Sequence, residues 1–126
     1  MVGTVLLIED EQNIMEAMRF LLSRDGWSVH THGKGVNAVE KISQVGPDVV
    51  ILDMMLPDCS GLEILKCLRG NSETKGLPVL MLTARGQQRD RKLAEKAGAT
   101  RFMTKPFSNA ELLQTVNDLA NSAAKP

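Results

Sequence analysis

Cysteine, long apolar runs and an excess of charge of one sign are all scarce or missing in this sequence. The two cysteines, Cys59 and Cys67, do not have the spacing of a metal site, and we expect reduced, unconnected thiols. No apolar run approaches the roughly 20 residues that a membrane span needs. The N-terminus has neither a secretory signal peptide nor an Arg-rich transit pattern. These absences favour a soluble protein of the reducing cytoplasm without a membrane partner.

The charges of the sequence balance, with 15 lysines and arginines against 15 aspartates and glutamates. The net charge therefore does not argue for direct binding to nucleic acid, and any contact with a polyanion must be local. The chain has 126 residues, of which 43% are hydrophobic. A chain of this size buries roughly two-thirds of its unfolded surface, enough for one core but not for two. We predict a single domain over residues 1–126, with its core at about 4–119 and no output domain in this chain.

Short apolar runs alternate with longer amphipathic stretches. The runs suit β-strands and lie at Thr4–Ile8, Ser28–His32, Asp48–Leu52, Leu77–Leu82 and Thr100–Met103. The stretches between and after them carry apolar residues at helical spacing. Uniformly apolar runs suit strands that are buried on both faces, whereas the more polar run at 28–32 suits a sheet edge. The predicted fold class is therefore α/β, a doubly wound five-stranded parallel sheet with five helices.

Polar residues follow four of the five predicted strands. Glu9-Asp10-Glu11 follow the first strand, Asp53 the third, Thr83 the fourth and Lys105 the fifth. Ligands of parallel sheets bind at the carboxyl ends of the strands, because loops and helix N-termini gather polar groups there. We therefore expect acids, a hydroxyl and an amine to converge on one edge of the sheet.

Each of these residues also has a simpler explanation when taken alone. Asp10 could cap the first helix, and Asp53 could be an ordinary loop acid. Thr83 could be structural, and Lys105 could be a solvated surface charge. The occurrence of all four at successive strand ends favours a functional site.

The residue types at this edge indicate phosphoryl chemistry assisted by a metal ion. Carboxylates this close repel one another unless a cation favours their ionised forms. Oxygen ligands without histidine or thiolate indicate Mg²⁺ or Mn²⁺ rather than zinc. Asp53 is then the candidate nucleophile, because a carboxylate can attack phosphorus and form an acyl phosphate. Lys105 would supply a fixed positive charge, and Thr83 would donate a hydrogen bond to a phosphoryl oxygen.

Four segments give the sequence a specific resemblance. They are Val5-Leu6-Leu7-Ile8-Glu9-Asp10, the segment from Val50 to Pro57 with Gly61, Met81-Leu82-Thr83-Ala84 and Lys105-Pro106-Phe107. With them, the sequence resembles the receiver family of two-component response regulators, which includes the chemotaxis regulator, from Thr4 to about Leu119. The resemblance implies the flavodoxin-like strand order 2-1-3-4-5. It also implies a signalling switch rather than an enzyme, one that catalyses only its own phosphoryl transfer and slow dephosphorylation.

By this resemblance, Asp53 would receive a phosphoryl group from the phosphohistidine of a sensor histidine kinase or a histidine phosphotransfer protein. Glu9, Asp10, Asp53 and the backbone carbonyl of Met55 would surround Mg²⁺, with Glu9 acting through water. The Lys105-Pro106 bond would be cis, which would direct Lys105 into the site.

The resemblance also implies a route for the signal. Phe102 would turn inward when Thr83 moves, although it could also be an ordinary core phenylalanine on the fifth strand. The face made by the fourth helix, fifth strand and fifth helix would then change and bind a downstream protein that the sequence does not identify.

Two departures from the family pattern modify these expectations. The turn Gly98-Ala99-Thr100-Arg101 lacks the acidic pair of receivers that dimerise next to winged-helix DNA-binding domains, which weighs against a transcription-factor dimer. Met55 and Arg85 stand two residues beyond Asp53 and Thr83, at positions that tune hydrolysis. Neither side chain offers a group that activates water, and we therefore predict slow autodephosphorylation.

Three other functions were weighed against this one. A phosphatase with an aspartyl-phosphate intermediate would need a second aspartate where Met55 stands. A nucleotide-binding protein would need a glycine-rich turn where Glu9-Asp10-Glu11 stand. A phosphate-independent docking module with the same fold remains the alternative.

Two further patterns have ordinary explanations. His30 and His32 share one strand face and could pair on a metal, but they suit an exposed edge strand. Arg85, Arg89 and Lys92 fall at helical spacing, yet the acids among them and the zero net charge argue against nucleic acid. We interpret this segment as a solvated or partner-docking face.

Overall fold

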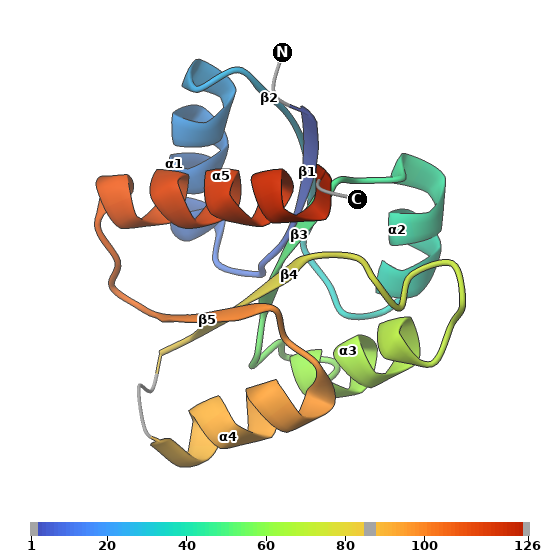
Figure 1. Cartoon of the computed structure of the whole chain (residues 1–126). Helices are drawn as coiled ribbons and strands as arrows, with labels where there is room; N and C mark the ends of the chain where they lie inside the picture. Colours follow the sequence, from blue (N-terminus) through green and yellow to red (C-terminus); the bar gives the residue numbers. More distant parts are fainter. Residues whose placement is uncertain (1–2, 85–87, 125–126) are drawn as a thin grey trace.

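The computed structural model describes residues 3–84 and 88–124, so Arg85 lies outside the described residues. Strands and helices alternate strictly along this part of the chain (Figure 1). The strands are β1 (Gly3–Ile8), β2 (Trp27–His32), β3 (Val49–Asp53), β4 (Val79–Thr83) and β5 (Arg101–Thr104). The helices are α1 (Gln12–Arg24), α2 (Ala38–Val45), α3 (Gly61–Arg69), α4 (Gln88–Ala97) and α5 (Asn109–Ala124).

The strands form one parallel sheet in the order β2-β1-β3-β4-β5. This confirms the predicted fold class and strand order. The polar strand β2 lies at an edge, as predicted, and its His30 is exposed. His32 is half-buried, and its Nε2 lies 2.8 Å from the carbonyl oxygen of Val36. Neither histidine belongs to the acidic group that could hold a metal within the described residues.

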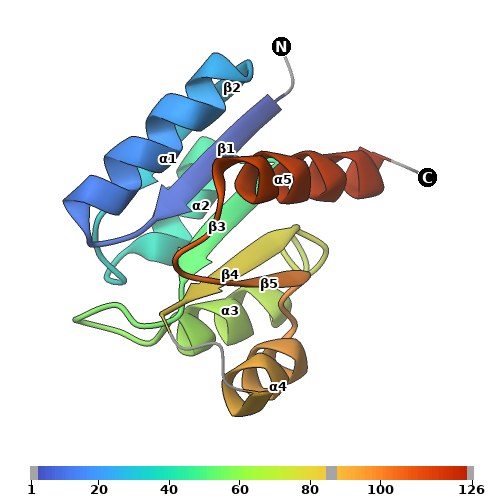
Figure 2. The same cartoon turned by 90° about the vertical axis from the view of Figure 1, so that its left-hand side faces the viewer.

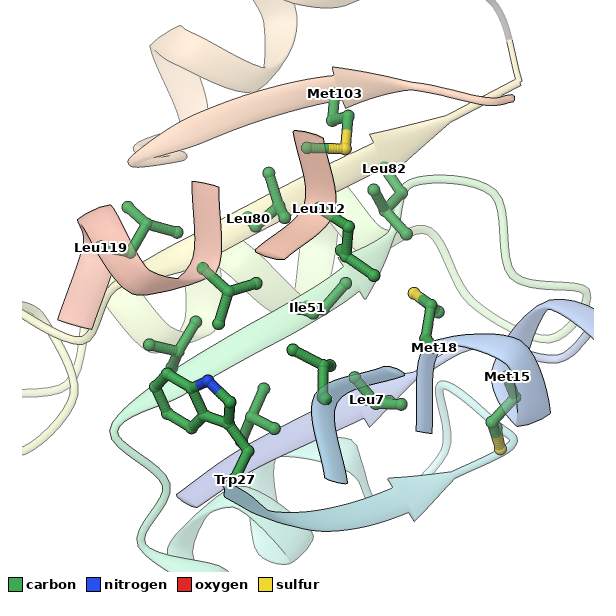
Figure 3. Packing of buried hydrophobic residues seen from close by; sticks show 14 residues of the cluster. Leu7, Met15, Met18, Trp27, Ile51, Leu80, Leu82, Met103, Leu112 and Leu119 are labelled. Carbon is green, nitrogen blue, oxygen red and sulfur yellow. The ribbon is translucent and has the colours of Figure 1, made fainter. Parts of the chain in front are cut away.

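Both faces of the sheet are covered by helices (Figures 1 and 2). Helices α1 and α5 lie on one face, and α2, α3 and α4 lie on the other. Alternate residues of each strand therefore enter two separate cores. Figure 3 shows the core beneath α1 and α5, where Leu7, Ile51 and Leu82 of three neighbouring strands meet Met18 and Leu112. Each such side chain stabilises the fold by about 1.5–3 kcal/mol on burial.

Strands β3 and β4 extend one residue beyond the apolar runs that predicted them. Asp53 pairs with Leu82, and Thr83 pairs with Thr104. The backbone hydrogen bonds of the sheet continue past both residues. The N–H of Met54 donates to the carbonyl oxygen of Leu82, and the N–H of Lys105 donates to the carbonyl oxygen of Thr83, each at 2.7 Å. Asp53 and Thr83 are therefore the last residues of their strands, and the sheet fixes their backbones.

Helix α4 is the least anchored of the three helices α2, α3 and α4 that cover one face of the sheet. Its one buried residue among those described is Ala94, whereas α3 buries Ile64, Leu65 and Leu68 on its apolar side. No helix of the described chain combines the length and the apolar character that crossing a membrane requires.

Candidate functional site

The carboxyl ends of β1, β3, β4 and β5 bring the predicted polar residues to one edge of the sheet. The ammonium of Lys105 lies 2.7 Å from Oε1 of Glu9 and 3.2 Å from Oδ2 of Asp53. Glu9, Asp53 and Thr83 are each at most 3% exposed. The Lys105–Pro106 bond is cis, as the resemblance implied. The predicted convergence is therefore confirmed for Glu9, Asp53 and Lys105, and Thr83 ends β4 at the same edge of the sheet.

Three carboxylates form a cluster at this edge. One oxygen each from Glu9, Asp10 and Asp53 lies within 4.8 Å of the others. Glu9 and Asp53 are buried, while Asp10 is exposed at the rim. The N-cap residue of α1 is Glu11, which makes no side-chain capping hydrogen bond. Asp10 is thus a member of the acidic cluster and does not cap the helix.

Glu11, which the sequence placed in the acidic run after the first strand without a role of its own, is a partner of Lys105. Its Oε1 lies 3.6 Å from the ammonium, and its side chain is 60% exposed. Its backbone N–H also donates to Oε2 of Glu9 at 3.2 Å. The start of α1 therefore fixes the Glu9 carboxylate and adds negative charge around Lys105.

Burial makes the ionised form of Glu9 unfavourable. Burial, the largest cause, and the neighbouring Asp53 carboxylate together raise the pKa of Glu9 from 4.5 to about 7, against the opposing effect of Lys105. Burial alone would lower the pKa of Lys105, but hydrogen bonding and charge attraction from Glu9 and Asp53 outweigh it, so that this pKa is raised. Lys105 is therefore a fixed cation among acids that repel one another.

The donor set fits a hard divalent cation. All three side chains of the cluster offer carboxylate oxygens, and no histidine or thiolate belongs to it. Oε1 of Glu9 is buried and lies 2.7 Å from the ammonium of Lys105. The carboxylate oxygens of Glu9, Asp10 and Asp53 keep lone pairs with which they can accept a cation or its bound water.

The backbone around Asp53 depends on a glycine in the next helix. The N–H of Met55 donates to Oδ1 of Asp53 at 3.1 Å, and the N–H of Gly61 donates to the carbonyl of Met54 at 2.9 Å. A Cβ at position 61 would overlap the carbonyl oxygen of Asp53. Ser60 caps α3 by accepting a 3.2 Å hydrogen bond from Leu62. Helix α3 can therefore begin directly against the end of β3.

Thr83 and Phe102 lie toward the layer that contains α4. Val79 and Met81 belong to the core beneath α2, α3 and α4, and strand alternation directs Thr83 to the same side. Phe102 is half-buried and packs against this core. The guanidinium carbon of Arg91 lies 5.1 Å from the centre of its ring, within the range of a cation–π contact. The sequence offered no signal for this contact, because it depends on how α4 is rotated on the sheet.

The comparisons with known proteins agree with this architecture. The family described as the response regulator receiver domain matches residues 5–117. The transcriptional regulatory protein TrcR of Mycobacterium tuberculosis is 42% identical over 115 residues, covering 91% of this chain and 44% of that protein. The phosphate regulon transcriptional regulatory protein PhoB of Escherichia coli is 38% identical over 116 residues, covering 92% of this chain and 51% of that protein. The chain thus spans about half the length of these curated relatives.

Solved structures show the same likeness. The chemotaxis protein CheY4 of Vibrio cholerae superposes with a TM-score of 0.87 at 31% identity, over 93% of this chain and 98% of that one. The receiver domain of the Francisella response regulator 1452 has a TM-score of 0.88 at 28% identity, over 95% and 98% of the two chains. Together with the family match, these findings show that the chain belongs to the response regulator receiver domains of two-component signalling.

Proposed function

We propose that Asp53 is the phosphoacceptor of this receiver domain and that it takes its phosphoryl group from a phosphohistidine. The donor would be a sensor histidine kinase or a histidine phosphotransfer protein. The observation that supports this most strongly is the position of the Asp53 carboxylate. It is buried at the end of β3, 3.2 Å from Lys105, with an oxygen within 4.8 Å of oxygens of Glu9 and Asp10.

Asp53 keeps electron pairs for a reaction with phosphorus. Oδ1 accepts a hydrogen bond from Met55, and Oδ2 accepts one from Lys105. A carboxylate oxygen has two lone pairs, so each oxygen retains one that can attack. In the proposed transfer, an O–P bond forms to Asp53 and the P–N bond of the phosphohistidine breaks. The electron pair of that bond returns to the imidazole, which takes a proton from solvent.

Lys105 and the acidic cluster would carry the charge of the transferred group. Lys105 can neutralise one phosphoryl oxygen from its place beside Asp53. We propose that Glu9, Asp10, Asp53 and the backbone carbonyl of Met55 hold Mg²⁺, with Glu9 acting through water. When bound, this ion would offset negative charge on the acids and on the phosphoryl group.

Thr83 and Phe102 would convert the modification into a change of surface. Thr83 ends the strand beside β3, and Phe102 lies two residues before Thr104, the β5 partner of Thr83. A movement of Thr83 toward the phosphoryl group would leave space on the α4 side of the sheet for Phe102. The α4–β5–α5 face would then bind a downstream protein. The domain acts as a switch, and catalysis is limited to its own phosphorylation and slow dephosphorylation.

Intact-protein mass after incubation with acetyl phosphate and Mg²⁺ tests this proposal. We expect a gain of one phosphoryl group that EDTA prevents and that Asp53→Ala abolishes. No gain in a protein that binds Mg²⁺ would favour the phosphate-independent docking module instead.

A further inference from the structure

A groove between α3 and α4 carries positive charge that the phosphorylation site does not use. It has a volume of about 610 Å³ between the two helices, and a hollow of about 540 Å³ continues it along α4. The two hollows share Leu93 and Lys96, so we treat them as one surface, the α3–α4 groove. Its cationic lining residues are Lys66, Arg69, Arg89, Lys92 and Lys96.

Most of this positive charge is not compensated. Within the described residues, Arg89, Lys92 and Lys96 have no ion-pair partner. The acids of α4, Asp90 and Glu95, do not line the groove in the part of the chain that the structure describes. Because like charges on neighbouring turns repel one another, an anionic partner would be favoured here.

Of the two groove cations on α3, Arg69 is held more firmly than Lys66. Lys66 lies 3.8 Å from Glu63, in a pair that is mostly exposed and therefore weak. Arg69 is half-buried and donates to the carbonyl oxygens of Gly98 at 2.8 Å and Thr74 at 3.2 Å. The groove thus has one fixed cation on α3 and three unpaired cations on α4.

Apolar side chains lie between the cations. Leu93 is 42% exposed, and Leu62 of α3 is half-buried beside it in the groove. Leu93 is also one of the few large hydrophobic side chains that the described chain exposes. A charged surface that also presents Leu62 and Leu93 suits an amphipathic segment whose apolar side covers these leucines while its acids meet the cations.

We infer that the α3–α4 groove docks an acidic, leucine-bearing segment of a partner protein. The unpaired cations of α4 support an acidic partner, and the leucines Leu62 and Leu93 among them distinguish the groove from a nucleic-acid site. Among the described lining residues there is no aromatic ring on which a base could stack, and the chain as a whole has no net charge. The groove shares α4 with the α4–β5–α5 face. Its lining is complete in the unmodified chain, so docking there does not require phosphorylation of Asp53.

Peptide binding to the unmodified full chain tests the inference. The probe is a fluorescent synthetic helix-forming peptide with glutamates on one side and leucines on the other, and its control has glutamine in place of every glutamate. Anisotropy gives the affinity at low salt, and amide chemical shifts locate the bound peptide. The groove variant is Lys92→Glu/Lys96→Glu. The matched variant, Lys34→Glu/Lys75→Glu, makes the same charge change at exposed lysines outside the groove.

We expect the acidic peptide to bind with shifts confined to α3 and α4, and added salt to weaken it. The groove variant should lose about tenfold or more in affinity, since two attractions become repulsions. The matched variant should bind nearly as well as the unmodified chain. Leu93→Ala should weaken binding, because it removes an apolar contact of the groove. The inference is overturned if the acidic peptide does not bind, if the glutamine peptide binds as tightly, or if both charge variants behave alike. It is also overturned if a DNA duplex of equal charge binds more tightly than the peptide.

Discussion

Lys105 is the residue on which the electrostatics of the site depend. It is 10% exposed and lies within 4 Å of three carboxylates, those of Glu9, Glu11 and Asp53. Without this cation, two buried acids would face each other at the end of the sheet, which is costly in a low-dielectric environment. The site therefore stores unfavourable carboxylate repulsion that a metal ion or a proton can relieve.

Glu9 should make stability depend on pH when no metal is present. Its pKa is raised to about 7 in the folded chain from 4.5, so its contribution is fully present below pH 4.5 and is lost as the pH rises through about 7. Glu9→Gln should therefore be more stable than the unmodified chain by about 1–3 kcal/mol at pH 8 in EDTA. Near pH 4.5 the two should unfold alike. Urea unfolding at both pH values measures the difference.

Glu16→Gln is the matched control for this experiment, because Glu16 is half exposed on α1 and pairs with Arg19. Its effect should be small at both pH values. Equal stability of Glu9→Gln and the unmodified chain at pH 8 would show that Glu9 is not strained in the fold.

Removing the charge of Lys105 should separate metal binding from phosphoryl transfer. In Lys105→Met the acids lose their internal cation, so Mg²⁺ should bind more tightly than to the unmodified chain. Phosphorylation by acetyl phosphate should nevertheless be slower by about 100-fold, because a positioned charge next to the reacting oxygens is gone. Calorimetry gives the affinity for Mg²⁺, and the rate of mass gain gives the transfer. Lys75→Met, at an exposed position, should change neither, and weaker Mg²⁺ binding in Lys105→Met would contradict this account.

At the scale of elements, the site depends on how closely α3 approaches the end of β3. Gly61 allows this approach, because any side chain there would overlap the backbone of Asp53 and Met54. Asp58, in the loop between β3 and α3, accepts hydrogen bonds from the N–H groups of Gly35 at 2.9 Å and Val36 at 2.8 Å. These bonds lower the pKa of Asp58 and tie the loop after β3 to the loop after β2.

Gly61→Ala should therefore destabilise the chain by about 2–4 kcal/mol, since the overlap is with backbone atoms that cannot move independently. Gly76→Ala is the control, because a Cβ there meets nothing within 4 Å. It should be neutral or slightly stabilising. Urea unfolding of both variants tests the comparison, and equal stabilities would mean that α3 can shift away from β3 without cost.

The sequence predicted the elements and the acidic edge because their signals are local. Glu9 and Asp53 each follow an apolar run directly, and Lys105 follows one after a single residue, Thr104. Parallel strands bring such positions together regardless of the intervening chain. The predicted C-terminal ends of β3 and β4 fell one residue early, because Asp53 and Thr83 are polar and join their strands through bonds to neighbouring strands. The contact of Arg91 with Phe102 and the pairing of Leu62 with Leu93 in one groove depend on helix rotation, which no local pattern fixes.

At the scale of the whole molecule, the two layers have different tasks. The layer of α1 and α5 covers a continuous apolar core (Figure 3). The layer with α4 contains Thr83, Phe102 and the least anchored helix. A change at Asp53 would therefore alter α4 and β5 more readily than α1 and α5, so the change in the proposed output face should come chiefly from α4 and β5.

The phosphorylated domain should keep its phosphoryl group for minutes or longer. Met55 stands two residues beyond Asp53, and its side chain is 68% exposed and apolar, so it cannot position a water for attack. Arg85, the second position expected to tune hydrolysis, lies outside the described residues. The loss of phosphoryl mass over time in Mg²⁺ buffer measures the lifetime, and a half-life of seconds or less would contradict the prediction.

The central claim, that Asp53 carries the phosphoryl group, is tested most directly by locating the modified residue. Borohydride reduces an aspartyl phosphate to homoserine, so the chain can be treated with acetyl phosphate and Mg²⁺, reduced, digested and sequenced by mass spectrometry. We expect homoserine at position 53 and nowhere else, and none when EDTA replaces Mg²⁺. Homoserine at Asp10 or another carboxylate with an unmodified Asp53, or no homoserine in a chain that binds Mg²⁺, would contradict it.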